Sequence, residues 1–151
     1  FKVAISKDRS IGFASVRTSK KMSRTINFYL KSYNITSEQW SVLRTLSEHD
    51  HISQKELSIR ADKDQATLTK ILDLLEKSEV IKRKVNPSDR RSFLIAITEK
   101  GKKLVEEVAP YLEEIFTKII NGIDEESLLI YLKVLKQLED NADSLLDDVN
   151  N

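Results

Sequence analysis

The chain contains no cysteine, only two prolines and only three glycines among its 151 residues. The lack of cysteine excludes disulfides, thiolate metal sites and cysteine-based redox sensing, and it is compatible with the cytoplasmic location that we expect. So few helix breakers favour a mostly helical fold. No apolar run approaches the roughly 18 residues that a membrane span needs. Residues 1–5 also lack the long apolar stretch of a signal peptide.

The residue sets that support enzyme chemistry are missing too. The chain has no Ser-His-Asp or Cys-His set and no paired-carboxylate motif with supporting context. Gly12, Gly101 and Gly122 are too dispersed to form a phosphate loop. His49 and His51 are too few, and wrongly spaced for one helical face, to form a zinc site. We therefore expect a protein that is not an enzyme and that uses no metal or cofactor.

The net charge of +1 conceals an uneven distribution along the chain. Residues 51–105 carry 13 Lys and Arg against 8 Asp and Glu, whereas residues 106–151 carry 3 against 12. The middle of the chain can therefore face a polyanion that the last third would repel. A soluble protein with an unevenly charged surface is the plain alternative.

Apolar residues at helical spacing, together with capping residues, predict six helices. They run from about Lys7 to Tyr33, from Ser37 to about Glu48, from Ser53 to Ala61, from Asp64 to at least Leu75, from Thr98 to about Asn121, and from Asp124 to Val149. Thr36 with Gln39, and Ser53 with Glu56, have the spacing of capping boxes. The last helix carries a heptad seam suited to packing against another helix: Leu128, Tyr131, Leu135, Leu138, Ala142, Leu145 and Val149.

The exposed side of the fourth helix is small and polar. Leu68, Ile71, Leu72 and Leu75 share its core face, which leaves Ala66 and Lys70 opposite and Thr67 and Thr69 on the flanks. A helix with that surface can enter a major groove, which is about 12 Å wide. An ordinary solvated helix face is the alternative.

β-Prone residues 80–85 and 92–97 flank the turn formers Asn86 to Asp89, which predicts a hairpin. This hairpin carries five cations: Lys82, Arg83, Lys84, Arg90 and Arg91. Crowding like charges brings no stability, so a polyanionic partner such as DNA is a natural explanation. Arginine at a hairpin tip suits a narrow A·T minor groove, where Asp89 can orient it through a bidentate pair. The alternative is a solvated hairpin with incidental charge.

Taken together, these segments resemble the MarR family of bacterial winged helix-turn-helix regulators. The matching segments are Leu57–Ala61, Ala66–Lys77, Val80–Arg83, Asp89–Arg91 and Leu94–Gly101. The most specific part is Asp-Arg-Arg followed by a strand that ends in Thr-x-x-Gly. The flanking helices match the family in length and placement, so the resemblance covers nearly the whole chain.

The resemblance implies a mainly α fold with a small β-hairpin. A winged helix-turn-helix DNA-binding domain would occupy residues 36–98, between a dimerisation helix in residues 1–35 and dimerisation helices in residues 99–151. A homodimer would place each fourth helix in a major groove and each wing tip in the flanking minor groove. The resemblance and the hairpin charge indicate these DNA-binding residues: Ser53, Gln54, Gln65, Ala66, Thr67, Thr69, Lys70, Lys82, Lys84, Asp89, Arg90 and Arg91.

One position departs from the family pattern. Glu79 stands where the family usually has a glycine, between the recognition helix and the first wing strand. Glycine ends a helix there in the left-handed conformation at little steric cost. Glutamate needs either a strained backbone, at about 1 kcal/mol, or a different exit from the helix. The orientation of the wing relative to the recognition helix therefore depends on this residue.

Many members of the family release DNA when a small molecule enters a cleft between the dimerisation and DNA-binding parts. The residues that can line such a cleft here are Met22, Tyr29, Tyr33, Trp40 and Arg44, with Arg44 meeting a carboxylate. Ordinary core packing is the alternative for these aromatic side chains.

The sequence thus predicts a transcription regulator, acting as a repressor, that binds a near-palindromic duplex operator as a homodimer. Its expected partners are duplex DNA, a second copy of itself and a small aromatic or lipophilic effector, with no role for a membrane. The alternative is a helical adaptor without enzymatic activity that binds proteins through its wing.

Overall fold

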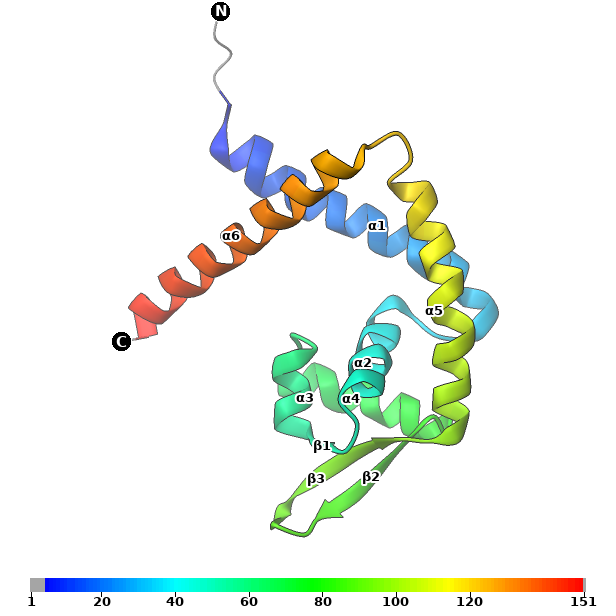
Figure 1. The fold of residues 1–151 in the computed structure, drawn as a ribbon. Coiled ribbons are helices and arrows are strands. Elements are labelled where there is room, and N and C mark those ends of the chain that lie inside the picture. Colours follow the sequence, from blue (N-terminus) through cyan, green and yellow to red (C-terminus); the bar gives the residue numbers. More distant parts are fainter. Residues whose placement is uncertain (1–4, 151) are drawn as a thin grey trace, which may run out of the picture. The chain divides into compact units, whose positions relative to one another are not determined.

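A computed structural model describes residues 5–150 of the chain. Residues 1–4 and 151, the outermost parts of the two predicted dimerisation segments, lie outside the described part. The described backbone falls into two compact units that divide between residues 113 and 114. The elements, shown in Figure 1, are the π-helix η1 (Lys7–Phe13), α1 (Ala14–Leu30), the 3-10 turn η2 (Lys31–Tyr33), α2 (Ser37–Glu48), β1 (Ile52–Ser53), α3 (Gln54–Arg60), α4 (Gln65–Lys77), β2 (Ile81–Asn86), β3 (Asp89–Ile97), α5 (Glu99–Ile119) and α6 (Glu125–Asn150).

The mainly α fold class with a small hairpin is confirmed, and each predicted helix is present. Side-chain caps explain where two of them begin. The Thr36 hydroxyl accepts the Gln39 N–H at 3.1 Å, and the Gln39 side-chain oxygen accepts the Thr36 N–H at 3.0 Å, so the first capping box is complete. The second is only half formed. Ser53 accepts the Glu56 N–H at 3.1 Å, but the Glu56 carboxylate pairs with Arg60 at 3.0 Å instead of reaching back.

The three strands form an antiparallel sheet in the order β1-β3-β2. Ile95 of β3 lies opposite Ile52, and Ile97 lies opposite Ile81. The pairing of β2 with β3 continues to Asn86 and Asp89, farther than the sequence predicts, so the tip of the hairpin is tight. Figure 1 shows this hairpin projecting away from α2, α3 and α4 as a wing.

The core of the first unit lies where α2, α4, the sheet and α5 meet. The predicted inner face of α4 is confirmed, because Leu68, Ile71, Leu72 and Leu75 are all buried. The sheet contributes the buried side chains Ile81, Ile95 and Ile97, and α5 contributes Val105, Val108 and Leu112. Trp40 of α2, a predicted cleft residue with core packing as the alternative, is half-buried.

The junction between α4 and β2 is a Schellman motif with glutamate at the left-handed position. The Val80 N–H donates to the Leu75 carbonyl at 3.1 Å, and the Glu79 N–H donates to the Glu76 carbonyl at 2.9 Å. Glu79 has a φ of 65°. Of the two exits expected for glutamate at this position, the structure shows the strained one.

The first turn of α5 holds this junction from the other side. Thr98 donates its backbone N–H to the Val80 carbonyl at 3.0 Å and its hydroxyl to the Glu79 carbonyl at 2.7 Å. One turn later, a Cβ at Gly101 would stand 2.2 Å from the Val80 oxygen, which no side chain can do. The Thr-x-x-Gly motif therefore exists to let α5 approach the end of the recognition helix.

In the second unit, α6 begins where the sequence predicts. The Asp124 carboxylate accepts the Ser127 N–H at 2.8 Å, and its hydrogen bonds to Ser127 lower the pKa of Asp124. No described residue of α6 is buried, and the seam residues Leu138 and Leu145 are 42% and 67% exposed. Separately, no helix in residues 5–150 is both long and apolar enough to cross a membrane.

Glu79→Gly is expected to raise the free energy of unfolding by about 1 kcal/mol, because glycine adopts the left-handed conformation without the clash of a Cβ. Urea denaturation followed by circular dichroism measures the change. Glu79→Ala is the control, since alanine loses the charge but keeps the Cβ. Equal stabilisation by both substitutions would attribute the effect to charge rather than to strain.

Candidate nucleic-acid interface

The recognition helix α4 begins at a strong cap. One Asp64 carboxylate oxygen accepts the Thr67 N–H at 2.8 Å, and the other accepts the Thr67 hydroxyl at 2.9 Å. These hydrogen bonds, the backbone one first, hold the pKa of the Asp64 carboxyl below its usual value. The start of α4 is therefore fixed by a charged acceptor at the positive end of the helix dipole.

The N-terminal half of α4 presents Gln65, Ala66, Thr69 and Lys70 as exposed residues. A threonine hydroxyl has one proton, and Thr69 donates its proton to the Gln65 carbonyl at 2.8 Å, as Thr67 does to its cap. In this structure both hydroxyls can therefore only accept further hydrogen bonds. Lys70 has no side-chain partner within residues 5–150, so it is a free donor on this face.

Side chains of α3 fix its position against α4. The Gln54 amide donates to the Thr69 hydroxyl at 2.9 Å, and the Gln65 amide donates to the Ser58 hydroxyl at 3.3 Å. The helix-turn-helix thus has two polar ties near the exposed residues. Ser53 and Gln54, predicted to bind DNA, are half-buried at the start of α3.

The cations of the wing lie on different sides of the hairpin because side chains alternate along a strand. Lys82 and Lys84 lie opposite Ala96 and Leu94 in the register and are exposed. Arg90 and Arg91 are exposed near the tip. Arg83 belongs to the other face, which includes its partner Ile95 and packs toward the helices.

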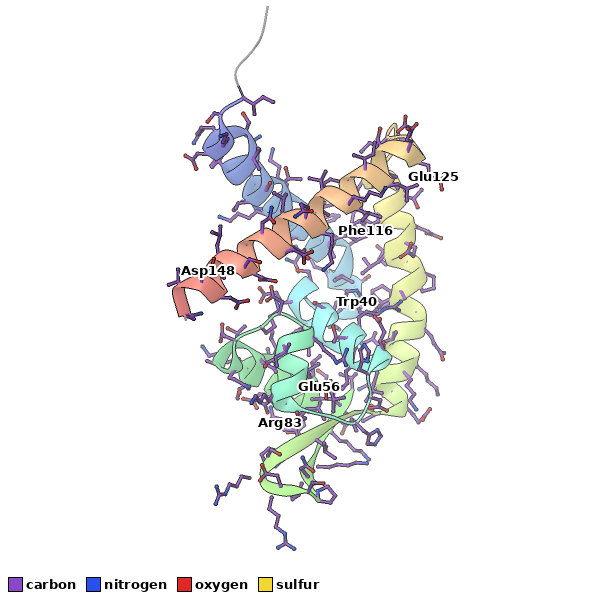
Figure 2. All side chains as sticks on the ribbon, turned by 60° about the vertical axis from the view of Figure 1, so that its left-hand side comes forward. Trp40, Glu56, Arg83, Phe116, Glu125 and Asp148 are labelled. Carbon is purple, nitrogen blue, oxygen red and sulfur yellow. The ribbon has the colours of Figure 1, made fainter. Side chains whose placement is uncertain are left out.

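Of the five cations of the hairpin, Arg83 binds the recognition helix. Its guanidinium lies 2.6 Å from the Asp73 carboxylate, 3.4 Å from the Thr69 carbonyl and 4.0 Å from the Glu76 carboxylate. The side chain is only 19% exposed. Figure 2 labels Arg83 where the hairpin meets the helices. Four wing cations remain exposed: Lys82, Lys84, Arg90 and Arg91.

At the wing tip, Asp89 orders the backbone. Its carboxylate accepts the Arg91 backbone N–H at 3.0 Å, and Asn86 similarly accepts the Ser88 N–H at 3.0 Å. Within residues 5–150 no ion pair joins Asp89 to an arginine guanidinium. The bidentate pair that we expected is therefore replaced, in this structure, by a bond to the chain itself.

One positioning residue was missed from the sequence. The Asp50 carboxylate accepts the Ile97 N–H at the end of β3 and the N–H of its neighbour His51, both at 2.9 Å. His51 has a left-handed φ of 57°. The signal was the polar turn His49-Asp50-His51, since an aspartate after a helix often binds the backbone of the following turn.

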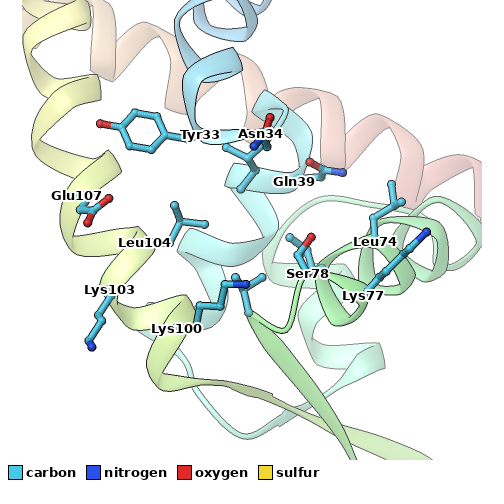
Figure 3. A pocket seen from close by; sticks show the side chains of 13 residues that line it. Tyr33, Asn34, Gln39, Leu74, Lys77, Ser78, Lys100, Lys103, Leu104 and Glu107 are labelled. Atoms are coloured by element: carbon cyan, nitrogen blue, oxygen red, sulfur yellow. The ribbon is translucent and has the colours of Figure 1, made fainter.

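The five predicted effector residues come from α1, the turn η2 and α2. Tyr29 and Tyr33 both contact the ring of Tyr111, with centroids 6.3 and 5.5 Å apart. Arg44 pairs with Glu48 at 3.3 Å. Of the five, Tyr33 alone lines the cavity of Figure 3, while Met22 and Trp40 are half-buried elsewhere.

A metal site is not formed by the described residues, since they contain no group of three or more His, Asp or Glu placed to hold an ion. The geometry instead defines a winged helix-turn-helix protein. Its α4 has a small exposed N-terminal half, and its basic hairpin is tied to that helix by Arg83.

Comparison with known proteins supports this class. The model of the MarR family matches residues 35–93. The transcriptional regulator PrsX of Escherichia coli is 30% identical over 131 residues, which cover 83% of this chain and 79% of PrsX. The regulator FarR of Neisseria gonorrhoeae is 28% identical over 140 residues, which cover 93% of this chain and 96% of FarR.

The fold is similar to that of Staphylococcus aureus MepR, solved as a complex with DNA, with a TM-score of 0.80 and 23% identity over 87% of this chain and 97% of MepR. The chain belongs to the MarR family of helix-turn-helix transcriptional regulators. Its relatives are regulators, which confirms that it is not an enzyme.

Lowering the pH below the usual carboxyl pKa of about 4 is expected to diminish the contribution of Asp64 to stability. Because its folded pKa lies below the usual value, the contribution is present above that value and is lost as the pH falls through the folded pKa. The difference in unfolding free energy between the wild type and Asp64→Ala, measured in urea at pH 7 and pH 3, should therefore shrink at pH 3.

Asp64→Asn is the matched control, because asparagine caps helices as well as aspartate does but has no charge to titrate. A difference between the wild type and Asp64→Ala that is equal at both pH values would show that the ionised carboxylate is not the acceptor that matters.

Proposed function

We propose that this regulator binds a near-palindromic duplex operator as a homodimer and acts as a repressor. The observation that carries the proposal is the linked surface of α4 and the wing. The helix α4 exposes the small residues Ala66 and Thr69, the hairpin exposes four cations, and Arg83 ties the two elements together. A dimer seated on promoter DNA hinders polymerase, which favours repression over activation.

In the proposed complex, Ala66 and Thr69 allow α4 to approach base edges and Lys70 donates to a base or a phosphate. Thr67, Gln65, Ser53 and Gln54 complete the major-groove side. On the wing, Lys82 and Lys84 meet phosphates, because they occupy the exposed face of β2. The tip formed by Asp89, Arg90 and Arg91 is proposed to reach the minor groove, where narrow A·T stretches attract guanidinium.

The homodimer is proposed from unpartnered apolar surface. The seam residues Tyr131, Leu138, Leu145 and Val149 of α6 are exposed, and so are Val16 and Phe28 of α1. Apolar side chains repeated along helices in this way normally pack against other helices. We propose that residues 1–35 and 99–151 supply the dimerisation helices, and that residues 36–98 supply the DNA-binding domain.

Release by a small aromatic or lipophilic ligand completes the proposal. The cleft residues remain those of the sequence-based hypothesis: Met22, Tyr29, Tyr33, Trp40 and Arg44. We also propose a cytoplasmic location, because the proposed role requires access to chromosomal DNA.

Leu138→Asp combined with Leu145→Asp is expected to abolish both dimerisation and operator binding, because buried unpaired carboxylates cost several kcal/mol. Sedimentation measures the dimer. Footprinting on enriched genomic fragments should show that the wild type protects two half-sites about one helical turn apart. Ser144→Asp adds a negative charge to α6 away from the seam and should change neither result.

A wild type that sediments as a folded monomer at micromolar concentration would contradict the dimer. An adaptor that binds proteins through its wing would instead show no salt-dependent mobility shift with random duplex DNA.

Substitutions at the wing tip test how Asp89 and Arg91 act. Arg91→Ala should weaken binding and flatten the slope of log affinity against log salt by about one unit for each phosphate that is no longer neutralised. Asp89→Ala should also weaken binding, although it removes a negative charge near DNA, because the tip loses its backbone tie. Asp89→Asn should retain most affinity, since an amide oxygen can accept the same N–H.

Fluorescence anisotropy over a salt series measures all three variants. Tighter binding by Asp89→Ala would mean that its carboxylate only repels DNA. An unchanged affinity and slope for Arg91→Ala would mean that the wing tip does not touch DNA.

A further inference from the structure

The helix-side face of the wing changes from buried to exposed partway along the hairpin. Three pairs of residues that lie opposite each other in the register of β2 and β3 form this face: Ile81 with Ile97, Arg83 with Ile95, and Val85 with Phe93. The isoleucines are buried, whereas Val85 and Phe93 are 58% and 46% exposed. Figure 1 shows the hairpin extending past α2, α3 and α4. The apolar face of the wing therefore continues beyond the helices against which it packs.

No other part of the described chain accounts for this exposed pair. Within residues 5–150, the ring of Phe93 neither stacks on another aromatic ring nor lies under a cation. The wing also lies outside residues 1–35 and 99–151, which are proposed to form the homodimer. Opposed side chains stabilise a hairpin modestly, and this is the alternative role for Val85 and Phe93.

The pair lies between the two parts of the proposed DNA surface. Arg83, two residues before Val85, is held to α4 by Asp73 at 2.6 Å, and the tip of the wing begins at Asn86, directly after Val85. In the proposed complex, α4 occupies a major groove and the tip occupies the flanking minor groove. One sugar-phosphate strand separates those two grooves. That strand must therefore run between α4 and the tip, past Val85 and Phe93.

The two faces of the hairpin differ in chemistry. Lys82 and Lys84 are exposed on the face opposite to that of Phe93. A minor groove is bounded by two backbone strands, so a hairpin that enters it turns one face toward each strand. The lysine face suits the phosphates of one strand. The face of Val85 and Phe93 suits the uncharged C–H edges of the deoxyriboses of the other, because an apolar surface gains nothing from a phosphate.

We propose that Val85 and Phe93 form an apolar contact with the deoxyriboses of the strand that separates the two grooves. The ring of Phe93 lies across a sugar, with Val85 beside it, and both side chains leave water on binding. The contact rests on the proposed function and deepens it, because it adds two DNA-contacting residues that carry no charge. It also gives each face of the wing its own strand of the duplex.

Phe93→Ala is expected to weaken binding to the operator fragment by about 10-fold, because apolar surface is lost, without changing the slope of log affinity against log salt, because no cation is lost. Phe93→Leu should retain most of the affinity. Leu74→Ala is the matched control: it truncates a comparably exposed apolar side chain in the last turn of α4, outside the proposed DNA surface, and should change nothing. Fluorescence anisotropy over a salt series measures all of these variants.

Hydroxyl-radical footprinting then locates the contact, because hydroxyl radicals cleave DNA by removing hydrogen from deoxyribose. The wild type should protect the sugars between each major-groove half-site and the flanking minor groove. Phe93→Ala should expose those sugars on the strand next to α4. Protection of the half-site, of the sugars beneath the tip and of the other strand should persist.

Equal affinity or equal protection for the wild type and Phe93→Ala would overturn the contact. A flattened salt slope together with lost protection beneath the tip would assign the pair to hairpin stability and overturn it as well, since a displaced tip carries Arg90 and Arg91 with it. Circular dichroism verifies that each variant is folded. A wild type that protects no DNA would overturn both the contact and the proposed function, whereas a wild-type footprint that Phe93→Ala leaves unchanged would overturn the contact alone.

Discussion

The arrangement of the DNA-binding unit depends on the close approach of α5 to the carbonyl of Val80. That approach is possible only because Gly101 has no side chain, and Thr98 secures it with hydrogen bonds to the Val80 and Glu79 carbonyls. Three elements meet at this point: the end of the recognition helix, the start of the wing and the start of α5. A change in any one of them must shift the other two, since packed interiors transmit displacement rather than absorb it.

Arg83 adds a second connection between the same helix and the wing, and it does so at some cost in free energy. Its Nε is buried without a hydrogen-bond partner in the described part of the chain, which is normally unfavourable. The ion pairs with Asp73 and Glu76 offset that cost. They also fix the angle between the hairpin and the helix. The wing is therefore attached to α4 both through the chain and through the ion pairs of Arg83. Although Arg83 makes no proposed DNA contact, it helps to set the direction in which the exposed cations of the wing point.

Sequence reasoning succeeded where one residue type has one dominant local role. The caps at Thr36 and Asp64 and the apolar face of α4 were all predicted, because capping and helical periodicity depend only on near neighbours. It failed for Arg83 and Asp50, whose partners are distant in the chain. Arg83 faces α4 because alternate residues of β2 point to opposite faces of the sheet. Which residues face the helices follows from the register of β2 with β3 rather than from composition. The hydroxyl protons of Thr67 and Thr69 could not be assigned until their acceptors were placed.

The two ends of α4 differ in chemistry for a physical reason. Its first half is capped, small and polar, which suits contact with a groove, whereas its last turn carries the exposed Leu74 beside unpaired lysines. A helix of 13 residues is short and stiff, so a displacement at one end moves the other almost as a rigid body. The left-handed residue at the end of α4, Glu79, is the point about which such a movement would turn, because strain stored in its backbone lowers the cost of leaving this conformation. Glutamate in place of glycine at that position thus puts backbone strain at the end of the recognition helix, next to the Val80 carbonyl that accepts the Thr98 N–H.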